Sequence, residues 1–330
     1  MRSPFAVGSL QLLCMLLCVA ALWLLLLWPL QLVCWLLRCC CRRTTTGAEQ
    51  PQNSRPRCVL VTGASSGIGE AVARHYATLQ GEEVLLALTG RNQQRLESVA
   101  DECRKLGAQV VCRVVDVTDA PGMEAFIEEV HALRPLDIVL ANAGVNFCTV
   151  GGHQQSFSQS CRDIFSINVD GVLNTVLPAS ALQAEVGRGT IAIVSSLAAY
   201  SHLYSIGDGE GSPYSATKAA VKMLGLHMRR RFAPKGVNVS VVCPGFVTSG
   251  MTKALNMGKL WMEIPAEEAA ARIHEGLCHN DAIISFPKTV DTLSYIGSVF
   301  PEAVTEQAIN LILAILSRKR KKRDVSTKED

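Results

Sequence analysis

The sequence contains no C-x-x-C pair and no cluster of histidine with cysteine, and it is poor in aromatic and charged side chains. Aromatic residues make up 5% and charged residues 18% of the 330 positions, against 48% hydrophobic residues. These proportions are typical of a globular chain and exclude a disordered one. The formal net charge of +3 is nearly balanced and gives no indication of nucleic-acid binding.

Cysteines are numerous, but they follow no regular spacing. Disulfide frameworks and zinc sites both have characteristic spacings, so we predict a reduced domain with no metal site. Six of the thirteen cysteines lie in or next to an apolar N-terminus, and the rest are scattered singly. The six are Cys14, Cys18, Cys34, Cys39, Cys40 and Cys41.

Charge is entirely missing from Ser3 to Leu37. This run is longer than the roughly 20 residues that cross a bilayer as a helix, so we expect a transmembrane anchor within residues 1–43. A cleaved signal peptide is the alternative, but its apolar part usually has only about 7 to 15 residues. Arg38, Arg42 and Arg43 follow the run, which favours a cytosolic position for the rest of the chain.

Other segments extend the predicted membrane contact. The run Cys39–Cys41 stands at the membrane edge, a position suited to S-palmitoylation. Residues 44–56, polar with one glycine and two prolines, indicate a linker. Toward the C-terminus the apolar run 308–316 meets the basic run 318–323. This pairing favours a membrane-associating tail over residues 291–330; a solvated tail and a nuclear import signal are the alternatives.

Between these ends, short apolar runs alternate with longer amphipathic stretches. Seven runs are predicted strands: Cys58–Thr62, Val84–Thr89, Gln109–Asp116, Asp137–Ala141, Thr190–Ser195, Asn238–Cys243 and Ala282–Phe286. The predicted helices are Gly67–Gln80, Gln93–Leu106, Pro121–His131, Gln159–Ala184, Tyr214–Phe232 and Ala266–Cys278. Strands separated by helices of this length pair in parallel, with helices on both faces of the sheet. We therefore predict one α/β domain over residues 57–290.

A glycine-rich turn follows the first predicted strand. The letters T-G-A-S-S-G-I-G run from Thr62 to Gly69, and a predicted helix begins within them. Glycines let a backbone turn tightly and approach a pyrophosphate, which the free amides of a helix start can bind. A glycine cluster alone is weak because turns are rich in glycine, but its place between a strand and a helix makes it a strong indication.

A second motif, Tyr214-Ser-Ala-Thr-Lys218, places a phenol and an ammonium on one face of a predicted helix. The usual pKa of tyrosine, about 10, makes it a poor acid or base at neutral pH, but a nearby cation stabilises the phenolate and lowers that pKa. Such a pair can give a proton to a carbonyl oxygen or take one from an alcohol. By itself this spacing also occurs by chance on the surface of many helices.

Together the two motifs resemble those of the short-chain dehydrogenase/reductase family, and the likeness extends over residues 57–286. The spacing T-G-x-x-x-G-x-G is similar to the glycine motif of that family. The resemblance implies a Rossmann-like, doubly wound fold with a mainly parallel seven-stranded sheet and helices on both faces. It also implies cofactor contacts by Gly63, Ser65, Ser66, Gly67, Ile68 and Gly69.

Arg91 follows the second predicted strand, where an NAD site would have an Asp or Glu for the ribose 2′-hydroxyl. An arginine there suits a 2′-phosphate instead, so we expect NADP(H) as cofactor; an exposed arginine at a helix start is the alternative. The resemblance implies adenine contacts by Asp116 and Val117, which we expect to end the third strand. It also identifies Asn142, Ala143 and Gly144 with the N-A-G motif of the family.

The resemblance assigns catalysis to Tyr214 and Lys218, which also contact the cofactor, and to Ser196 as the hydrogen-bond donor to the substrate oxygen. Ser195 is the less favoured choice of the two serines. Asn168 matches the helix asparagine that holds a water linking the lysine to solvent; a polar residue on a helix face is its alternative. The segment that would embrace the nicotinamide contains Pro244, Gly245, Val247 and Ser249, the last standing where the family commonly has threonine.

Two features concern the substrate. The segment Gly207–Gly211 lengthens the usual interval between Ser196 and Tyr214, and indicates either a loop that gates the substrate entrance or a tolerated insertion. The segment after Ser249 is apolar, which fits either a lid over a lipophilic substrate or ordinary core packing. Its members are Met251, Met257, Trp261 and Met262.

The leading hypothesis is NADP(H)-dependent reduction of a lipophilic ketone or aldehyde in lipid metabolism, such as a 3-keto sphingoid base, acyl chain, steroid or retinoid. The same residues would also oxidise an alcohol. A non-catalytic, cofactor-binding membrane scaffold or sensor is an alternative, and a secreted enzyme is another, for which a glycan on Asn238 would be diagnostic. We expect an endoplasmic reticulum membrane location and no nucleic-acid partner, with a homodimer and a homotetramer both open.

Overall fold

A computed structural model describes residues 55–150, 155–200, 213–255, 262–299 and 307. The predicted anchor, nearly all of the linker, most of the C-terminal tail, the segment at 207–211, Met257 and Trp261 lie outside these described ranges, and those expectations stay predictions. Within the described ranges, no helix combines the length and the apolar character needed to cross a membrane.

The described residues build one seven-stranded sheet. Its strands are β1 (Cys58–Thr62), β2 (Leu85–Thr89), β3 (Gln109–Arg113), β4 (Ile138–Ala141), β5 (Gly189–Val194), β6 (Val237–Pro244) and β7 (Ile283–Phe286). All neighbours pair in parallel, in the order β3-β2-β1-β4-β5-β6-β7. Apart from the edge strands and one residue of β6, every strand residue is buried, as parallel strands covered on both faces require. The predicted fold class is therefore confirmed.

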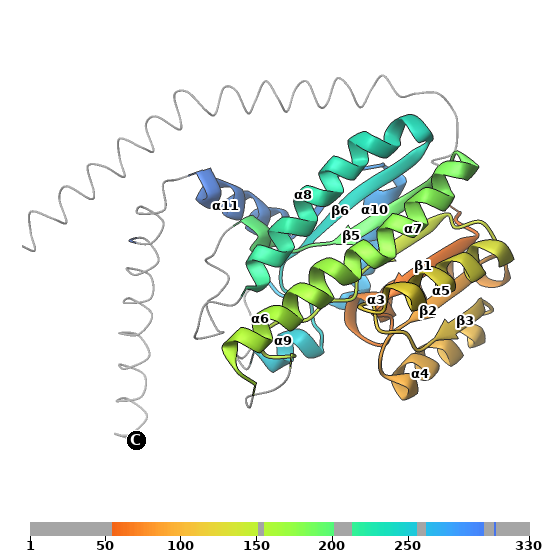
Figure 1. Ribbon diagram of the computed structural model, residues 1–330, viewed down its shortest axis with the longest axis horizontal. Coiled ribbons are helices and arrows are strands. Elements are labelled where there is room, and N and C mark those ends of the chain that lie inside the picture. The colour runs from red at the N-terminus through yellow and green to blue at the C-terminus, as the bar shows by residue number, and fades with distance from the viewer. Residues whose placement is uncertain (1–54, 151–154, 201–212, 256–261, 300–306, 308–330) are drawn as a thin grey trace, which may run out of the picture. The chain divides into compact units, whose positions relative to one another are not determined.

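Helices cover both faces of this sheet (Figure 1). The helices are α3 (Gly67–Gln80), α4 (Gln93–Lys105), α5 (Ala120–Leu133), α6 (Phe157–Phe165), α7 (Gly171–Val186), α8 (Tyr214–Phe232), α9 (Gly250–Ala254), α10 (Ala266–Cys278) and α11 (Lys288–Val299). The short turns are η2 (Gly81–Glu83), η4 (Ser166–Asp170), η5 (Leu197–Tyr200) and η7 (Ala233–Lys235). One apolar core lies beneath α3, α4 and α10, and a second beneath α5, α7 and α8.

The strand order fixes where a ligand can bind. From β1 the chain builds outward through β2 and β3, and then returns to place β4 on the other side of β1. Such a switch point opens a crevice at the carboxyl ends of the two strands, because the loops there leave in opposite directions. The glycine-rich turn follows β1, and the Asn142-Ala143-Gly144 segment follows β4, so both predicted motifs meet at this crevice.

Two predicted elements differ from the structure. The third strand ends at Arg113 rather than at Asp116, because its partner β2 ends opposite it at Thr89 and leaves nothing to pair with. The predicted helix Gln159–Ala184 is interrupted by the π-helical turn η4. A π turn keeps the helical direction and adds one residue per turn, so the apolar pattern of the sequence does not reveal it.

Helix α11 was not predicted. Its sequence is rich in Thr and Val and includes Gly297, all of which have low intrinsic helix propensity. Tertiary packing holds it in place: the Tyr295 ring meets the Tyr200 ring of η5 edge-on, with centroids 6.5 Å apart. Packing of this kind outweighs propensity in short helices.

Candidate active site

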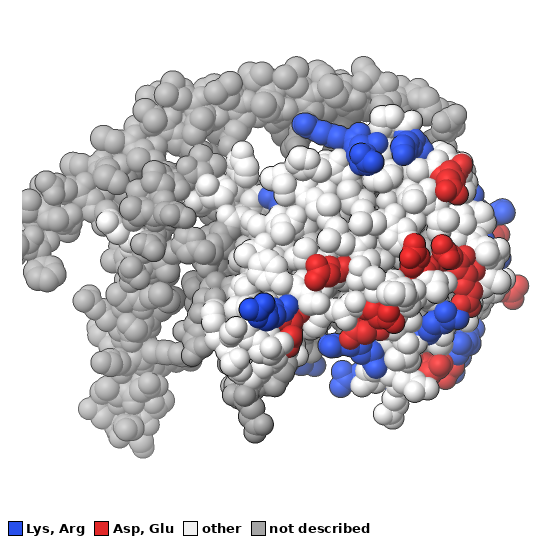
Figure 2. Space-filling view, viewed as in Figure 1, with Lys and Arg blue, Asp and Glu red and all other residues white. Residues whose placement is uncertain are grey.

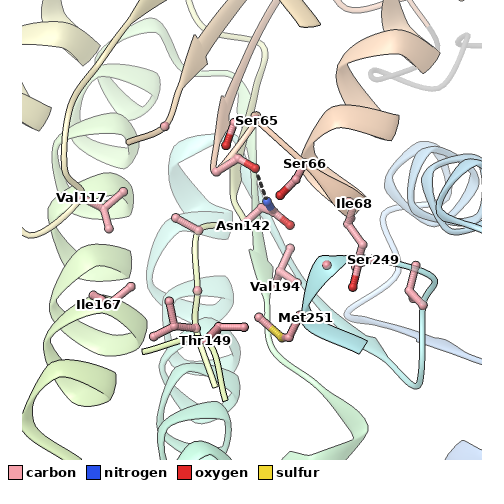
Figure 3. A pocket seen from close by; sticks show the side chains of 18 of the residues that line it. Ser65, Ser66, Ile68, Val117, Asn142, Thr149, Ile167, Val194, Ser249 and Met251 are labelled. Carbon is pink, nitrogen blue, oxygen red and sulfur yellow. Dashed lines mark hydrogen bonds between the residues drawn. The ribbon is translucent and has the colours of Figure 1, made fainter. Parts of the chain in front are cut away.

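A cavity of about 600 Å³ opens at the carboxyl ends of the strands (Figure 3). Most of the predicted site residues line it: Gly63, Ser65, Ser66, Gly67, Ile68, Arg91, Asp116, Val117, Asn142, Ala143, Gly144, Ser196, Tyr214, Lys218, Pro244, Gly245, Val247 and Ser249. Gly69 and Asn168 do not line it and lie behind its wall. The sequence motifs therefore converge on one concave site, of a size that suits a bound cofactor.

The glycine turn permits contacts that no other residue would allow. Gly63 has φ of +65°, and a Cβ there would lie 2.9 Å from the Cα of Ala143. A Cβ on Gly69 would lie 2.4 Å from the carbonyl oxygen of Gly63. Gly69 therefore serves the close packing of α3 against the turn. Ser66, the N-cap residue of α3, does not cap the helix with its hydroxyl, so the first amides of α3 are available to an anion.

Hydrogen bonds across the switch point hold this turn in shape. The Thr62 hydroxyl accepts from the amides of Asn142, at 3.0 Å, and Ala143, at 3.1 Å. The Asn142 side chain donates back to the carbonyl oxygens of Thr62, at 2.9 Å, and Gly63, at 3.3 Å. Figure 3 shows the Asn142 side chain beside the turn that carries Ser65 and Ser66. Asn142 thus lines the cavity while its amide group braces the glycine turn.

One end of the cavity is rich in arginine. Arg91 follows β2, is 59% exposed, and lies 4.0 Å from the Asp116 carboxylate. Arg95, in the first turn of α4, also lines the cavity. The Asn92 side chain accepts from the Arg95 amide at 2.9 Å and so caps α4. Sequence reasoning missed Arg95; its place in the first turn of the predicted helix Gln93–Leu106, close after Arg91, was the signal that could have found it.

The other end of the cavity is where the Tyr214 and Lys218 side chains meet. Both come from the first turns of α8, and the Lys218 ammonium lies 5.6 Å from the centroid of the Tyr214 ring. Lys218 is only 3% exposed, and its ammonium donates to the Val194 carbonyl oxygen at 3.0 Å. Burial lowers the pKa of Lys218 to about 8. Burial also raises the pKa of the neighbouring Cys243 thiol to about 11, so at neutral pH the thiol brings no charge to this pair.

The two serines after β5 have different surroundings. The Ser195 hydroxyl is buried and donates to the main-chain oxygen of Lys218 at 2.7 Å, so it braces α8 against the sheet. Ser196 is partly exposed, and its hydroxyl accepts from the Ala198 amide at 3.1 Å. That amide belongs to η5, which therefore orients the Ser196 hydroxyl at the cavity wall.

Asn168 is fully buried in the π turn η4. Its side chain accepts from the Val145 amide at 2.8 Å and donates to the Val145 carbonyl oxygen at 2.9 Å and to the Thr217 hydroxyl at 3.1 Å. A Cβ on Gly144 would lie 3.1 Å from the Asn168 amide oxygen and 3.2 Å from the Lys218 ammonium. Asn168 thus ties the segment after β4 to the helix that carries Lys218.

The segment after β6 closes the cavity beside the glycine turn, where a Cβ on Gly67 would lie 3.2 Å from the Ser249 Cβ. Val247 bridges to Ile264, and the Ser249 hydroxyl accepts from the Thr252 amide in a capping box that starts α9. Ser249 therefore caps a helix as well as lining the cavity. Met251 projects toward the cavity (Figure 3), whereas Met262 accepts from the Thr289 hydroxyl at 3.5 Å. Further lining residues that the sequence did not single out are Asn92, Val145, Thr149, Ile167 and Thr252.

The arrangement fits a dinucleotide with a redox-active ring. A side-chain-free turn at a helix start suits a pyrophosphate, two arginines stand at one end, and a phenol beside a buried ammonium stands at the other. In the described ranges no group of three or more His, Cys, Asp or Glu side chains could hold a metal. Fold and site together define a nicotinamide-dependent oxidoreductase.

Comparison with known proteins names the family. The family model for short chain dehydrogenases matches residues 57–259, so the chain belongs to the short-chain dehydrogenase family. A curated relative, 11-beta-hydroxysteroid dehydrogenase-like 2 of Arabidopsis thaliana, is 31% identical over 260 residues, which are 77% of this chain and 80% of the relative. The chain is thus an oxidoreductase of this family, which uses a nicotinamide cofactor.

Solved structures share the fold. A short chain dehydrogenase/reductase from Burkholderia phymatum, in complex with NAD, has a TM-score of 0.62 at 21% identity and covers 73% of this chain and 92% of its own. A short-chain dehydrogenase from Sphingobium yanoikuyae, in complex with NADPH, has a TM-score of 0.59 at 22% identity and covers 75% and 97%. At these identities the likeness concerns the fold alone.

Proposed function

We propose that the chain is an NADP(H)-dependent oxidoreductase that interconverts a carbonyl and an alcohol, and that it mainly reduces lipophilic ketones. The observation that carries the proposal is the joint placement of Arg91 and Tyr214 on one cavity with Lys218. Arg91 stands where an acidic residue would hold the ribose of NAD, and the arginine end of the cavity favours a 2′-phosphate.

The glycine turn Gly63–Gly69 would hold the pyrophosphate, Asp116 and Val117 the adenine, and Pro244 to Ser249 the nicotinamide. A bound nicotinamide supplies the hydride that this chemistry needs. Asp116 also accepts from the Thr118 amide at 3.0 Å, which fixes its carboxylate at the adenine end. With these assignments, most residues that line the cavity contact a part of the dinucleotide that suits their chemistry.

The chain's own residues provide the proton. The Tyr214 phenol gives its proton to the substrate oxygen as negative charge develops there, and takes it back in alcohol oxidation. The Lys218 ammonium favours the phenolate that is left behind, because an opposite charge lowers the pKa of the phenol. The Ser196 hydroxyl, oriented by the Ala198 amide, donates to the same oxygen and stabilises its charge.

The choice of a lipophilic substrate has three supports. Val145, Ile167 and Met251 contribute apolar side chains to the lining of the cavity that Tyr214 also lines. The name of the Arabidopsis relative refers to a hydroxysteroid, a molecule of this kind. The charge-free run at 3–37 favours attachment to a membrane, which concentrates lipophilic molecules. We place the enzyme on the cytosolic side of the endoplasmic reticulum membrane, held by an N-terminal anchor and a basic C-terminal tail.

The test uses the full chain in detergent. NADPH oxidation is measured against NADH oxidation with a panel of lipid ketones and aldehydes, for the wild type, Tyr214→Phe and Tyr295→Phe. Tyr295 is a half-exposed tyrosine of α11 outside the cavity, so its variant should keep full activity. Loss of the general acid in Tyr214→Phe should lower kcat by about a hundredfold to ten-thousandfold.

Two results would count against the proposal. A preference for NADH would remove the assignment of NADP(H). Tight binding of cofactor with no turnover of any carbonyl, and no oxidation of the matching alcohols, would favour a cofactor-binding scaffold instead.

A further inference from the structure

The edge of the domain opposite the cavity has an unusual surface. In a parallel sheet with helical crossovers, the helices run opposite to the strands, so helix ends and strand starts share one edge. We call this the strand-start edge. It contains the ends of α3, α4, α5, α7 and α8 and the first residues of the strands that follow them.

Large apolar side chains are exposed at four of these five helix ends. They are Leu79 of α3, Leu106 after α4, Leu133 of α5 and Val186 of α7, with exposed fractions of 47%, 44%, 61% and 42%. Single exposed apolar residues need no explanation, but four in equivalent positions on one edge form a distributed apolar surface.

Basic side chains accompany the apolar ones at the ends of α7 and α8. Arg231 and Lys235 lie 6.0 and 5.5 Å from the Phe232 ring and flank a cleft between the two helix ends. Arg230 and Arg188 are exposed beside them. Figure 2 shows Lys and Arg side chains gathered over the end of α8. Among the described residues, Glu185 alone brings an acidic side chain to this cleft.

The chain also enters the domain at this edge. Asp137 accepts from the Arg57 amide at 2.7 Å and pairs with the Arg188 guanidinium at 2.7 Å, so the start of β1 is tied to the end of α7. The thirteen residues 44–56 separate Arg57 from the predicted anchor. Fully extended, they reach about 45 Å, so the domain cannot travel far from the membrane.

We infer that the strand-start edge is a docking surface for an anionic lipid bilayer, with Leu79, Leu106, Leu133 and Val186 at the interface and Arg230, Arg231 and Lys235 toward the headgroups. The inference rests on the membrane anchoring proposed above. Apolar side chains combined with basic ones are what an anionic membrane surface binds. Glu82, Glu83 and Asp137 line a second cleft together with Arg188, so the attraction is concentrated at the basic side chains at the end of α8.

This orientation determines which edge of the domain faces water. The cavity opens at the carboxyl ends of the strands, on the far edge, so docking leaves the cofactor site facing water. The domain would then exchange its cofactor freely while held against the bilayer.

The test is hydrogen exchange on the full chain reconstituted in vesicles, either phosphatidylcholine alone or phosphatidylcholine with phosphatidylserine. Docking should slow exchange in the last turns of α5, α7 and α8 on the anionic vesicles and leave the glycine turn unchanged. Each basic side chain near an anionic surface strengthens docking by roughly fivefold. The variant Arg231→Glu with Lys235→Glu should therefore reduce the protection by about thirtyfold or more.

A matched control is Arg162→Glu with Lys288→Glu, which makes the same charge change at exposed residues of α6 and α11. It should keep the protection. A second variant, with Leu106, Leu133 and Val186 each changed to Ser, should lose it; because these side chains are exposed, the fold should persist. Equal protection on the two vesicle types, or protection that survives both edge variants, would overturn the inference.

The readout separates this inference from the proposed function. Protein that does not float with vesicles at all would show that the anchoring is wrong. Protein that floats and turns over NADPH, yet shows no protection at the strand-start edge, would overturn the docking surface alone.

Discussion

The Lys218 ammonium donates to the main-chain oxygen of Val194 across 3.0 Å, from a side chain that is 3% exposed. The carbonyl oxygen of the last residue of β5 therefore stabilises the buried ammonium of α8. This hydrogen bond also fixes the distance between the ammonium and the Tyr214 ring. A charge held by a backbone dipole keeps its position when the phenol gains or loses a proton.

Burial of this lysine predicts a pH effect on stability. The pKa of Lys218 is lowered from 10.5 to about 8, so between these values the unfolded chain binds a proton that the folded chain does not. Stability should therefore rise with pH through this window, by about 3 kcal/mol relative to Lys218→Met. Urea denaturation at both ends of the window measures the change, with the exposed Lys105→Met as control. A parallel pH dependence in wild type and Lys218→Met would contradict the burial argument.

The two serines after β5 should separate catalysis from packing. Ser196→Ala should lower kcat by about a hundredfold, because a donor to the developing oxyanion is lost. Ser195→Ala should leave kcat nearly unchanged and cost about 1 kcal/mol of stability, because its bond to the Lys218 carbonyl is lost. Steady-state kinetics and thermal denaturation of both variants make the comparison. The assignment fails if Ser195→Ala is the variant with the larger loss of kcat.

Arg91→Ala should change the choice of cofactor. Loss of a charge-assisted bond to the 2′-phosphate should raise KM for NADPH by about tenfold or more and leave KM for NADH nearly constant. Arg113→Ala is the control, since Arg113 is an exposed arginine that pairs with Glu129 outside the cavity. If KM rises equally for both cofactors, Arg91 serves binding in general and does not select NADP(H).

Gly69→Ala should damage the cofactor site although Gly69 does not line it. The new methyl group would lie 2.4 Å from the Gly63 carbonyl oxygen and must displace the turn, at a cost of about 1 to 3 kcal/mol. Fluorescence titration with NADPH should show weaker binding. Gly297→Ala, where a Cβ meets no atom within 4 Å, should bind normally and be slightly more stable. Unchanged binding in Gly69→Ala would mean that the turn tolerates displacement.

The sequence was sufficient to predict the sheet, because buried parallel strands are continuous apolar runs. In the helices between them, the apolar residues recur with a clear helical period. The family resemblance of the two motifs also implied that the glycine turn and Tyr214 share a site, and both line the cavity. The sequence could not predict the π turn at Asn168 or helix α11. Both depend on tertiary contacts, to Val145 in one case and to Tyr200 in the other.

The sequence also could not predict which hydrogen-bond partners the polar side chains of the site take. The Ser249 hydroxyl was expected to serve the cofactor, and the structure shows it capping α9. Asn142 was expected to contact the cofactor as part of the N-A-G motif; it lines the cavity, and its side-chain amide also braces the glycine turn. In each case a hydrogen bond within the protein satisfies the polar group, across three positions for Ser249 and 80 positions for Asn142, and a motif cannot reveal which partner such a group takes.

The bonds between Thr62 and Asn142 have a consequence for how the site meets its ligand. They join the ends of β1 and β4 through groups that belong to the fold itself. The glycine turn is consequently rigid before any nucleotide arrives, and little conformational entropy remains to be lost when one binds. The sheet sets the shape of the pyrophosphate-binding turn, so the binding site is formed before the ligand binds.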